Sequence, residues 1–153
     1  MQKKDSKMIK NHKIEVEIRK IKNHEFNELY QLLRKKWFLD KSIKIKDYNQ
    51  LIKNSSTIYV VEKKNKLVGT AMLHFQKKLI RNGSIAAFIE EVFVDEKERG
   101  KGIGSMLIQH LIKEAKNHGC YKIVLSCFDA RTTFYQRCGF RKESNTMRIN
   151  LLK

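Results

Sequence analysis

The amino-acid sequence predicts a mixed α/β domain built on a largely antiparallel sheet with one parallel βαβ crossover. Short apolar segments rich in β-branched residues follow one another through the chain, and a long amphipathic segment at 102–118 separates two of them. The expected order of elements is β-α-α-β-β-β-α-β-α-β, without internal repeats or proline. A right-handed crossover through the long helix would make the strands that flank it parallel.

The N-terminal half of the chain is expected to form strands and helices in the order β-α-α-β-β. Alternating apolar residues predict a strand at 15–21, and apolar residues at helical spacing predict a helix at 24–36. A short second helix is expected at 47–54, and 37–45 is left unassigned. A polar turn at 63–66 joins two β-branched segments into a hairpin. Those two strands are expected at 56–62 and 67–76.

The C-terminal half begins with a strong turn signal. The pair Asn82-Gly83 favours a type I′ turn that leads into a central strand at 84–95. Gly119 is a natural end for the helix at 102–118. The remaining elements are a strand at 121–127, a helix at 130–138 and a terminal hairpin at 140–152.

The charge of the chain is unusual, because 33 Lys and Arg residues against 16 Asp and Glu residues give a net charge of +17. Such a field attracts polyanions, including nucleic acids, anionic membranes and phosphorylated small molecules. The lysines are spread along the whole chain, which is also the ordinary pattern of a solvated surface. No nucleic-acid recognition motif and no apolar run of about 20 residues are found. We therefore expect neither a nucleic-acid nor a membrane partner.

The ends of the chain and its cysteines suggest a cytoplasmic protein. Residues 1–13 lack the apolar region of a secretory signal, so we expect a short disordered basic tail before a single domain at 14–153. Cys120, Cys127 and Cys138 are odd in number and lie in apolar patterns, which favours reduced thiols. No pair of His or Cys residues has metal-ligand spacing, and no metal site is expected.

The segment at 90–105, which reads EEVFVDEKERGKGIGS, carries the strongest functional signal. An apolar run at 92–94 leads into a glycine-spaced basic turn at 99–104, and the long helix follows at once. Glycines let the backbone approach a ligand closely, and the N-terminus of a helix favours an anion. The turn lacks the spacing of a Walker motif, and it follows the fourth strand rather than the first. A turn that only links strand to helix is the simpler alternative.

In this setting the turn resembles the GNAT superfamily of acyl-CoA-dependent N-acyltransferases. Its pattern R/Q-x-x-G-x-G/A is met by Arg99, Gly102 and Gly104. The resemblance implies helices on both faces of the sheet and acetyl-CoA as co-substrate, with the turn on the pyrophosphate and the strand on the pantetheine arm and thioester. The residues implied at the coenzyme are Val92, Phe93, Val94, Arg99, Gly100, Lys101, Gly102, Ile103, Gly104 and Ser105. We add Arg131, which departs from the family pattern and could serve the phosphates of the coenzyme.

Three further segments resemble one branch of that superfamily, the glucosamine-6-phosphate N-acetyltransferases. They are FIEEVFV at 88–94, GCYKIVLSC at 119–127 and FYQRCGF at 134–140. The resemblance implies direct acetyl transfer from acetyl-CoA to the amine of glucosamine 6-phosphate, a step toward UDP-GlcNAc. It also implies a homodimer in which each C-terminal strand completes the partner's sheet, and the exposed apolar segment at 147–152 would favour such pairing.

The same resemblance implies roles for individual residues. Tyr135 would donate a hydrogen bond or a proton to the departing coenzyme sulfur, unless it is only a core aromatic. Glu90 and Glu91 would face the amine, although on a regular strand only one of them could enter the site. Lys78 and Arg81 would contact the sugar phosphate, the alternative being solvated surface charge.

The chain departs from the pattern of that branch at four positions around the acceptor. Phe88 stands where the family has histidine, Ser126 where it has an acidic residue, Arg131 where it has asparagine, and Asn150 where it has arginine. Arg148 lies two residues from Asn150 on the same strand face and could supply a shifted contact to the phosphate. Ser126 and Arg148 are therefore included in the expected substrate-binding set.

Two other functions stay open at the level of sequence. An acetyltransferase of the same fold could modify another amine, such as a polyamine, an aminoglycoside or a protein N-terminus. A non-catalytic acyl-CoA-binding or nucleic-acid-associated module would not need Tyr135 together with Glu90 and Glu91. A strongly cationic protein repels cationic amines, which favours the phosphorylated acceptor. No histidine occupies a motif position from which it could activate a cysteine, so an acyl-enzyme is not expected.

Overall fold

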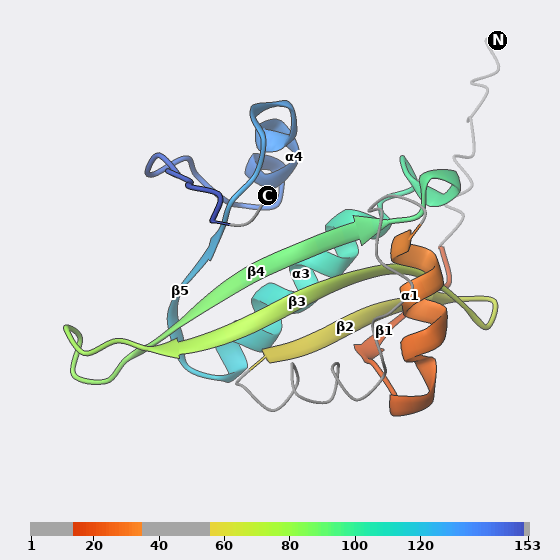
Figure 1. The fold of residues 1–153 in the computed structure, drawn as a ribbon, viewed down its shortest axis with the longest axis horizontal. Helices are drawn as coiled ribbons and strands as arrows, with labels where there is room; N and C mark the ends of the chain where they lie inside the picture. The colour runs from red at the N-terminus through yellow and green to blue at the C-terminus, as the bar shows by residue number, and fades with distance from the viewer. Residues whose placement is uncertain (1–13, 35–55, 152–153) are drawn as a thin grey trace, which may run out of the picture.

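The computed structural model describes residues 14–34 and 56–151, which form a five-stranded sheet with helices on both faces (Figure 1). This architecture confirms the predicted fold class. The predicted tail at 1–13, the unassigned segment at 37–45 and the second helix at 47–54 lie outside the described residues. The principal elements are β1 (Glu17–Lys20), α1 (Phe26–Arg34), β2 (Ser56–Lys63), β3 (Lys66–Lys77), β4 (Ile85–Val94), α3 (Ile103–Asn117), β5 (Cys120–Leu125) and α4 (Thr132–Arg137).

The strands lie in the order β1-β2-β3-β4-β5. The first four pair antiparallel, whereas β5 pairs parallel to β4 after the crossover through α3. The predicted crossover is therefore confirmed. The prediction that 84–95 forms the central strand is wrong, because β3 lies in the middle of the described sheet. The crossover adds only β5 beyond β4, and no later described segment pairs with β5.

The two β-hairpins have different turns. Lys64 and Asn65 both have positive φ (49° and 59°) and join β2 to β3 directly, as a type I′ turn requires. Asn82 and Gly83 also have positive φ, but the last pair of β3 and β4 is Lys77 with Ile85. The predicted tight turn therefore sits at the tip of a longer connection, closed by the hydrogen bond from Ser84 N–H to Arg81 O at 2.9 Å.

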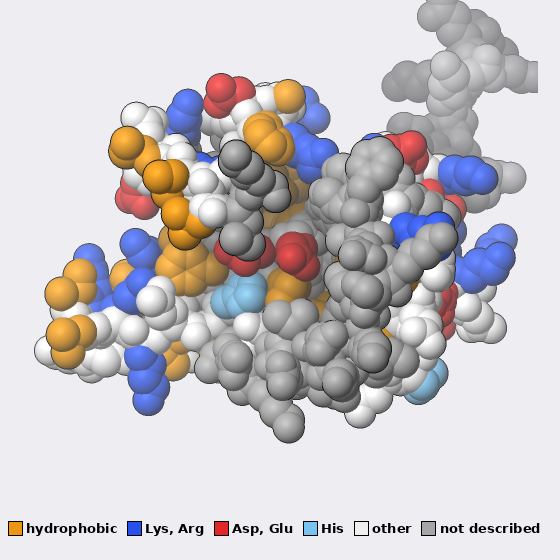
Figure 2. Space-filling model, in the orientation of Figure 1, with side chains coloured by type: hydrophobic (Ala, Val, Ile, Leu, Met, Phe, Trp, Pro, Cys, Tyr) orange, Lys and Arg blue, Asp and Glu red, His pale blue; other side chains and the backbone are white. Residues whose placement is uncertain are grey.

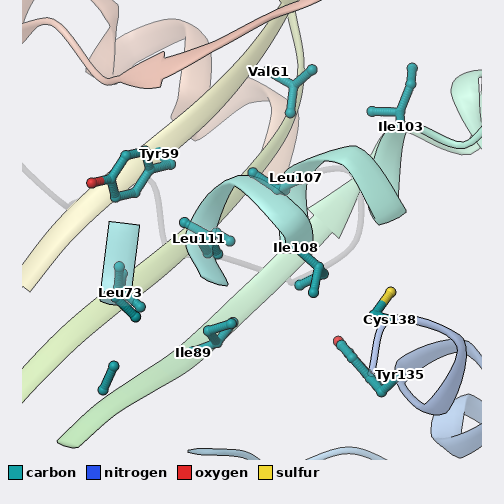
Figure 3. Packing of buried hydrophobic residues seen from close by; sticks show 13 residues of the cluster. Tyr59, Val61, Leu73, Ile89, Ile103, Leu107, Ile108, Leu111, Tyr135 and Cys138 are labelled. Carbon is teal, nitrogen blue, oxygen red and sulfur yellow. The ribbon is translucent and has the colours of Figure 1, made fainter. Parts of the chain in front are cut away.

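Each face of the sheet has its own apolar core. On one face, α3 and α4 pack against β2, β3 and β4 (Figure 3). Leu107, Ile108 and Leu111 of α3 are fully buried there. On the other face, α1 covers apolar side chains that alternate along the strands with those of the first core. The residues of this second core are Phe26, Leu29, Leu32, Leu33, Ile58, Val60, Leu67, Met72 and Phe93.

The predicted terminal hairpin is wrong for the described residues 140–151, which contain no strand. The chain leaves the sheet after β5, passes through α4 and ends in an irregular segment (Figure 1). Met147, Ile149 and Leu151 are 95%, 81% and 86% exposed. Their alternation is that of a strand with one apolar face, but in the described structure this segment pairs with no strand of its own chain.

An ion network links the edge of the sheet to the start of α1. Arg19 donates to both carboxylate oxygens of Glu25, at 2.8 and 2.6 Å, and also to Glu62. The hydrogen bonds from Arg19, followed by burial acting in the opposite direction, bring the pKa of Glu25 to about 2. The Glu25 side chain is only 10% exposed, so the pair is largely shielded from solvent.

Replacing Arg19 by alanine is expected to lower the free energy of unfolding by roughly 2–3 kcal/mol at pH 7, because two partly buried carboxylates lose their cation. The Glu25–Arg19 pair contributes fully to the free energy of unfolding above 4.5, the pKa of Glu25 in the unfolded chain, and this contribution is lost as the pH falls toward 2. The difference in free energy of unfolding between wild type and Arg19→Ala should therefore shrink over that interval. Urea denaturation of both proteins at pH 7 and pH 3 measures this difference. Arg141→Ala, which removes an exposed pair with Glu143, is the control and should change stability little.

Candidate active site

A cavity of about 470 Å³ opens at the end of β4, where this strand and β5 separate. Pairing between the two strands stops at Ile89 and Leu125, although β4 continues to Val94. Residues at the start of α3 and in α4 complete the lining of this cavity. The cavity is lined by Val92, Phe93, Val94, Glu98, Arg99, Gly100, Gly102, Ile103, Gly104, Ser105, Arg131, Phe134 and Tyr135.

The glycine turn takes a backbone conformation that only glycine adopts without strain. Gly100 and Gly102 have φ values of 74° and 82°, and Gly102 is the N-cap of α3. The first N–H groups of a helix have no partner within it and carry the positive end of its dipole. At Gly104 a Cβ would lie 3.2 Å from the Phe134 ring, so this position needs its close approach to α4. The turn can hold a phosphate group.

One predicted coenzyme residue, Lys101, does not line the cavity. The Lys101 ammonium donates to Lys97 O at 2.7 Å and to Glu98 Oε2 at 3.0 Å, and Lys101 is absent from the lining. The other predicted coenzyme residues all line the cavity. Glu98 and Phe134 also line it and were not predicted. Phe134 could have been noticed as the neighbour of Tyr135, whereas nothing in the sequence distinguishes Glu98 from other surface glutamates.

Tyr135 reaches the cavity from α4 and is 7% exposed. Its ring packs edge-on against Phe134 and Phe140, at centroid distances of 4.9 and 6.1 Å, which fixes its direction. Burial raises the pKa of the phenol above its ordinary value of 10, and the charge of Arg131 lowers it by a smaller amount. The phenol therefore keeps its proton at neutral pH and can donate it.

The two glutamates lie at a β-bulge in β4. The pairing of β3 with β4 shifts between Thr70 and Met72, and Glu91 takes a φ of 52°. Such a bulge changes the direction of a side chain, and both glutamates are exposed at it, outside the linings of the two cavities that contain Tyr135. Burial, and then repulsion by Glu90, raises the pKa of Glu91, while His74 acts in the opposite direction. Figure 2 shows acidic side chains side by side with a histidine in the middle of this face.

The residues predicted to bind the sugar phosphate are not brought together within one chain. Lys78 lies 5.0 Å over the Phe88 ring and donates to Gln76, while Arg81 lies 4.9 Å over the Tyr121 ring. The exposed Arg148 donates to Asn150 at 2.7 Å. None of the three lines either cavity that contains Tyr135.

Ser126 lies at the end of β5 and lines a second cavity of about 460 Å³, which also reaches Tyr135. Its hydroxyl is 3.3 Å from that of Thr146 in the C-terminal segment. Of the substrate residues predicted outside β4, Ser126 is thus the one that the structure places next to Tyr135. Residues 140–146, the first part of the predicted terminal hairpin, also line this cavity.

A histidine that sequence reasoning missed stands beside the glutamates. His74 on β3 has Nδ1 2.5 Å from Ser56 Oγ and Nε2 3.2 Å from Glu90 Oε2. His74 pairs across the sheet with Phe88. Phe88 is the residue that stands where the resembled family has histidine. The available signal was a histidine between apolar residues within the predicted strand.

The described residues include no helix that is long and apolar enough to cross a membrane. Within residues 14–34 and 56–151, no group of three or more His, Cys, Asp or Glu side chains is arranged to hold a metal ion. Cys120, Cys127 and Cys138 are free thiols.

Comparisons with known proteins agree with this geometry. The family model described as "Acetyltransferase (GNAT) family" matches residues 23–140. Glucosamine 6-phosphate N-acetyltransferase 1 of Dictyostelium discoideum is 35% identical over 111 residues, which are 70% of this chain and 71% of that protein. The glucosamine 6-phosphate N-acetyltransferase of Candida albicans is 31% identical over 137 residues, which are 90% of this chain and 82% of that protein.

Solved structures share the fold over nearly the whole chain. The glucosamine-6-phosphate N-acetyltransferase of Arabidopsis thaliana superposes with a TM-score of 0.80 at 27% identity, covering 90% of this chain and 99% of that one. An acetyltransferase of Trypanosoma brucei gives a TM-score of 0.84, also at 27% identity, and covers 90% and 100%. The chain belongs to the acetyltransferase (GNAT) family and is an acetyl-transferring enzyme.

Proposed function

We propose that this enzyme transfers the acetyl group of acetyl-CoA to the amine of glucosamine 6-phosphate, giving N-acetylglucosamine 6-phosphate for UDP-GlcNAc synthesis. The observation that carries the proposal is one cavity that joins an anion-binding helix start to a buried phenol, with two carboxylates on the strand that leads into it. Relatives of this chain carry the name of that activity. The family uses acetyl-CoA as acetyl donor.

In our proposal the coenzyme lies along the cavity from the turn to Tyr135. The N–H groups at the start of α3 bind its pyrophosphate, and Arg99 and Arg131, which line the same cavity, add positive charge. The backbone of Val92–Val94 contacts the pantetheine arm and the thioester carbonyl. An N–H aimed at that carbonyl oxygen would stabilise the negative charge that develops as the amine attacks. Lys101 lies outside this set because its ammonium is held by Glu98.

Replacing Gly102 by alanine is expected to weaken acetyl-CoA binding about tenfold. Its φ of 82° is a left-handed conformation, which costs a non-glycine residue of order 1 kcal/mol or more and would displace the first N–H groups of α3. Calorimetric titration with acetyl-CoA measures the affinity. Gly83→Ala, at φ 77° in the distant hairpin loop, is the matched control. Equal losses in both variants would show that strain, rather than the position of the turn, is responsible.

The proposed chemistry is direct transfer within a ternary complex. A carboxylate at the bulge accepts a proton from the substrate ammonium, since only the free amine attacks a thioester. The amine forms a bond to the carbonyl carbon, the carbon–sulfur bond breaks, and Tyr135 gives its proton to the departing thiolate. The thiolate leaves as the thiol of coenzyme A, and the proton taken from the amine returns to solvent.

Another primary amine, from a small molecule or a protein N-terminus, is the alternative acceptor. Incubation with acetyl-CoA and a panel of amines, with free thiol as the readout, separates the cases. Thiol release restricted to amino-sugar phosphates supports the proposal. Release with polyamines, aminoglycosides or peptides instead assigns another acceptor. If no amine in the panel releases thiol, acetyl transfer to each of these amines is contradicted.

We also propose a cytoplasmic homodimer in which each C-terminal segment pairs as a strand with the partner chain. The support is the exposed face of Met147, Ile149 and Leu151, which alternates with Arg148 and Asn150 on the other side. Pairing in this way would carry Arg148 toward a second site. Sedimentation velocity should show a dimer, and Ile149→Asp should give a monomer. A monomeric wild type would contradict the proposal.

A further inference from the structure

Three polar side chains form a row across β2, β3 and β4 on the α1 face of the sheet. Ser56 is the direct partner of His74 in the β2–β3 pairing. Glu90 pairs with Met72, two residues from His74, so His74 and Glu90 are diagonal neighbours on one face. The row continues the buried side chains that pack under α1 and ends at the glutamates of the bulge.

The contacts of the imidazole determine where its proton lies. His74 Nδ1 is 2.5 Å from the Ser56 hydroxyl, which can donate or accept. His74 Nε2 is buried, makes no hydrogen bond of good geometry to the described residues, and lies 3.2 Å from a Glu90 carboxylate oxygen. A ring lone pair facing that carboxylate would be repelled, whereas an N–H would be attracted. The position of this carboxylate therefore favours the tautomer with the N–H at Nε2.

The two partners of His74 differ in how firmly they are held. Ser56 is buried, at 8% exposure, and anchors one side of the ring. The Glu90 side chain is 64% exposed, against 28% for His74. An exposed glutamate has several rotamers, and ordering it costs free energy. A neighbouring N–H on a fixed ring selects the rotamers in which the carboxylate stays near the bulge.

We propose that His74 is a positioning residue that holds the Glu90 carboxylate toward the acceptor amine, so that Glu90 binds the ammonium and Glu91 accepts its proton. The proposal rests on the acetyl transfer proposed above and assigns the two glutamates different tasks. His74 contacts Glu90, not the reacting atoms, so it acts through that carboxylate.

The environment of Glu91 agrees with this division. Burial and the neighbouring Glu90 charge raise its pKa, and a carboxylate with a raised pKa takes a proton from an ammonium more readily. Among residues 14–34 and 56–151, Glu90 and Glu91 on β4 are the charged groups that interact with the imidazole, and Lys78 lies over the Phe88 ring opposite it. On β2 the ring meets the neutral Ser56.

Steady-state kinetics on three variants test the proposal. His74→Leu should raise KM for the acceptor amine about tenfold, because the Glu90 carboxylate loses the attraction that orders it, and leave KM for acetyl-CoA unchanged. His74→Gln keeps an N–H at similar reach and should recover most of the loss. Ser56→Ala removes the hydrogen-bond partner of Nδ1, and its KM for the amine should lie between those of the other two variants. The control is His118→Gln, because His118 stacks on Phe75, the next residue of β3, which packs in the core of the opposite face.

The amine used is whichever substrate the thiol-release panel identifies, so the two proposals fail separately. Activity on an amine other than glucosamine 6-phosphate overturns the proposed acceptor and leaves the His74 comparison intact. Wild-type KM in a folded His74→Leu variant overturns the positioning role. A glutamine variant as impaired as the leucine variant overturns it too, because ring packing alone would then explain the loss. Absence of activity with every amine overturns both proposals.

Discussion

Replacing Tyr135 by phenylalanine is expected to lower kcat about 100-fold, the lower range for loss of a general acid, while acetyl-CoA affinity changes little. The phenol is buried in the wall of the cavity and its pKa is raised, so at neutral pH it carries the proton that the thiolate needs. Phenylalanine keeps the packing against Phe134 and Phe140. Single-turnover rates and calorimetric titration separate the chemical step from coenzyme binding.

The matched control for this substitution is Tyr121→Phe, which removes a phenol from a partly exposed ring on β5. It should leave kcat unchanged. A Tyr135→Phe enzyme with wild-type kcat would show that Tyr135 is only a core aromatic, the alternative that the sequence left open. Equal losses of kcat and coenzyme affinity would instead indicate a distorted cavity.

Replacing Glu91 by glutamine is expected to lower kcat at least 100-fold, because the amine then loses its proton acceptor. Glu90→Gln should act mainly on KM for the amine. The pKa of Glu91 is raised above 4.5, so wild-type kcat should fall with decreasing pH through a value above 4.5 as this carboxylate is protonated. The pH profiles of kcat for the wild type and for both variants check this. The reverse pattern, with kcat lost in Glu90→Gln and kept in Glu91→Gln, would contradict the assignment.

Local signals in the sequence were enough for the fold and for the coenzyme end of the site. The glycine turn was predicted because closely spaced glycines and the amphipathic pattern that follows them are properties of neighbouring residues, and the structure gives Gly102 the positive φ that such a turn needs. The crossover followed from the order of elements, since a parallel pair needs a long connection. The terminal segment shows the limit of such signals. Alternation at Met147, Ile149 and Leu151 reports that one face is apolar, but not which strand will cover it.

The acceptor end depends on contacts between strands, which the sequence alone does not specify. The bulge at Glu91 arises from a register shift opposite Ala71, and register is a property of two strands together. For the same reason His74 could be read as one residue of a strand, but not as the neighbour of Glu90. The structure also redirects Lys101 to Glu98, a partner that was not predicted.

The central claim is that this enzyme acetylates a phosphorylated amino sugar. The most direct test is the ratio of kcat/KM for glucosamine 6-phosphate to that for glucosamine, with product identified by mass spectrometry. A phosphate that meets a cationic site should improve kcat/KM by about 100-fold or more, through charge-assisted hydrogen bonds of about 1.5–3 kcal/mol each. A ratio of 100 or above, with N-acetylglucosamine 6-phosphate as product, is the predicted result. A ratio near one, or a preference for the unphosphorylated amine, would contradict it.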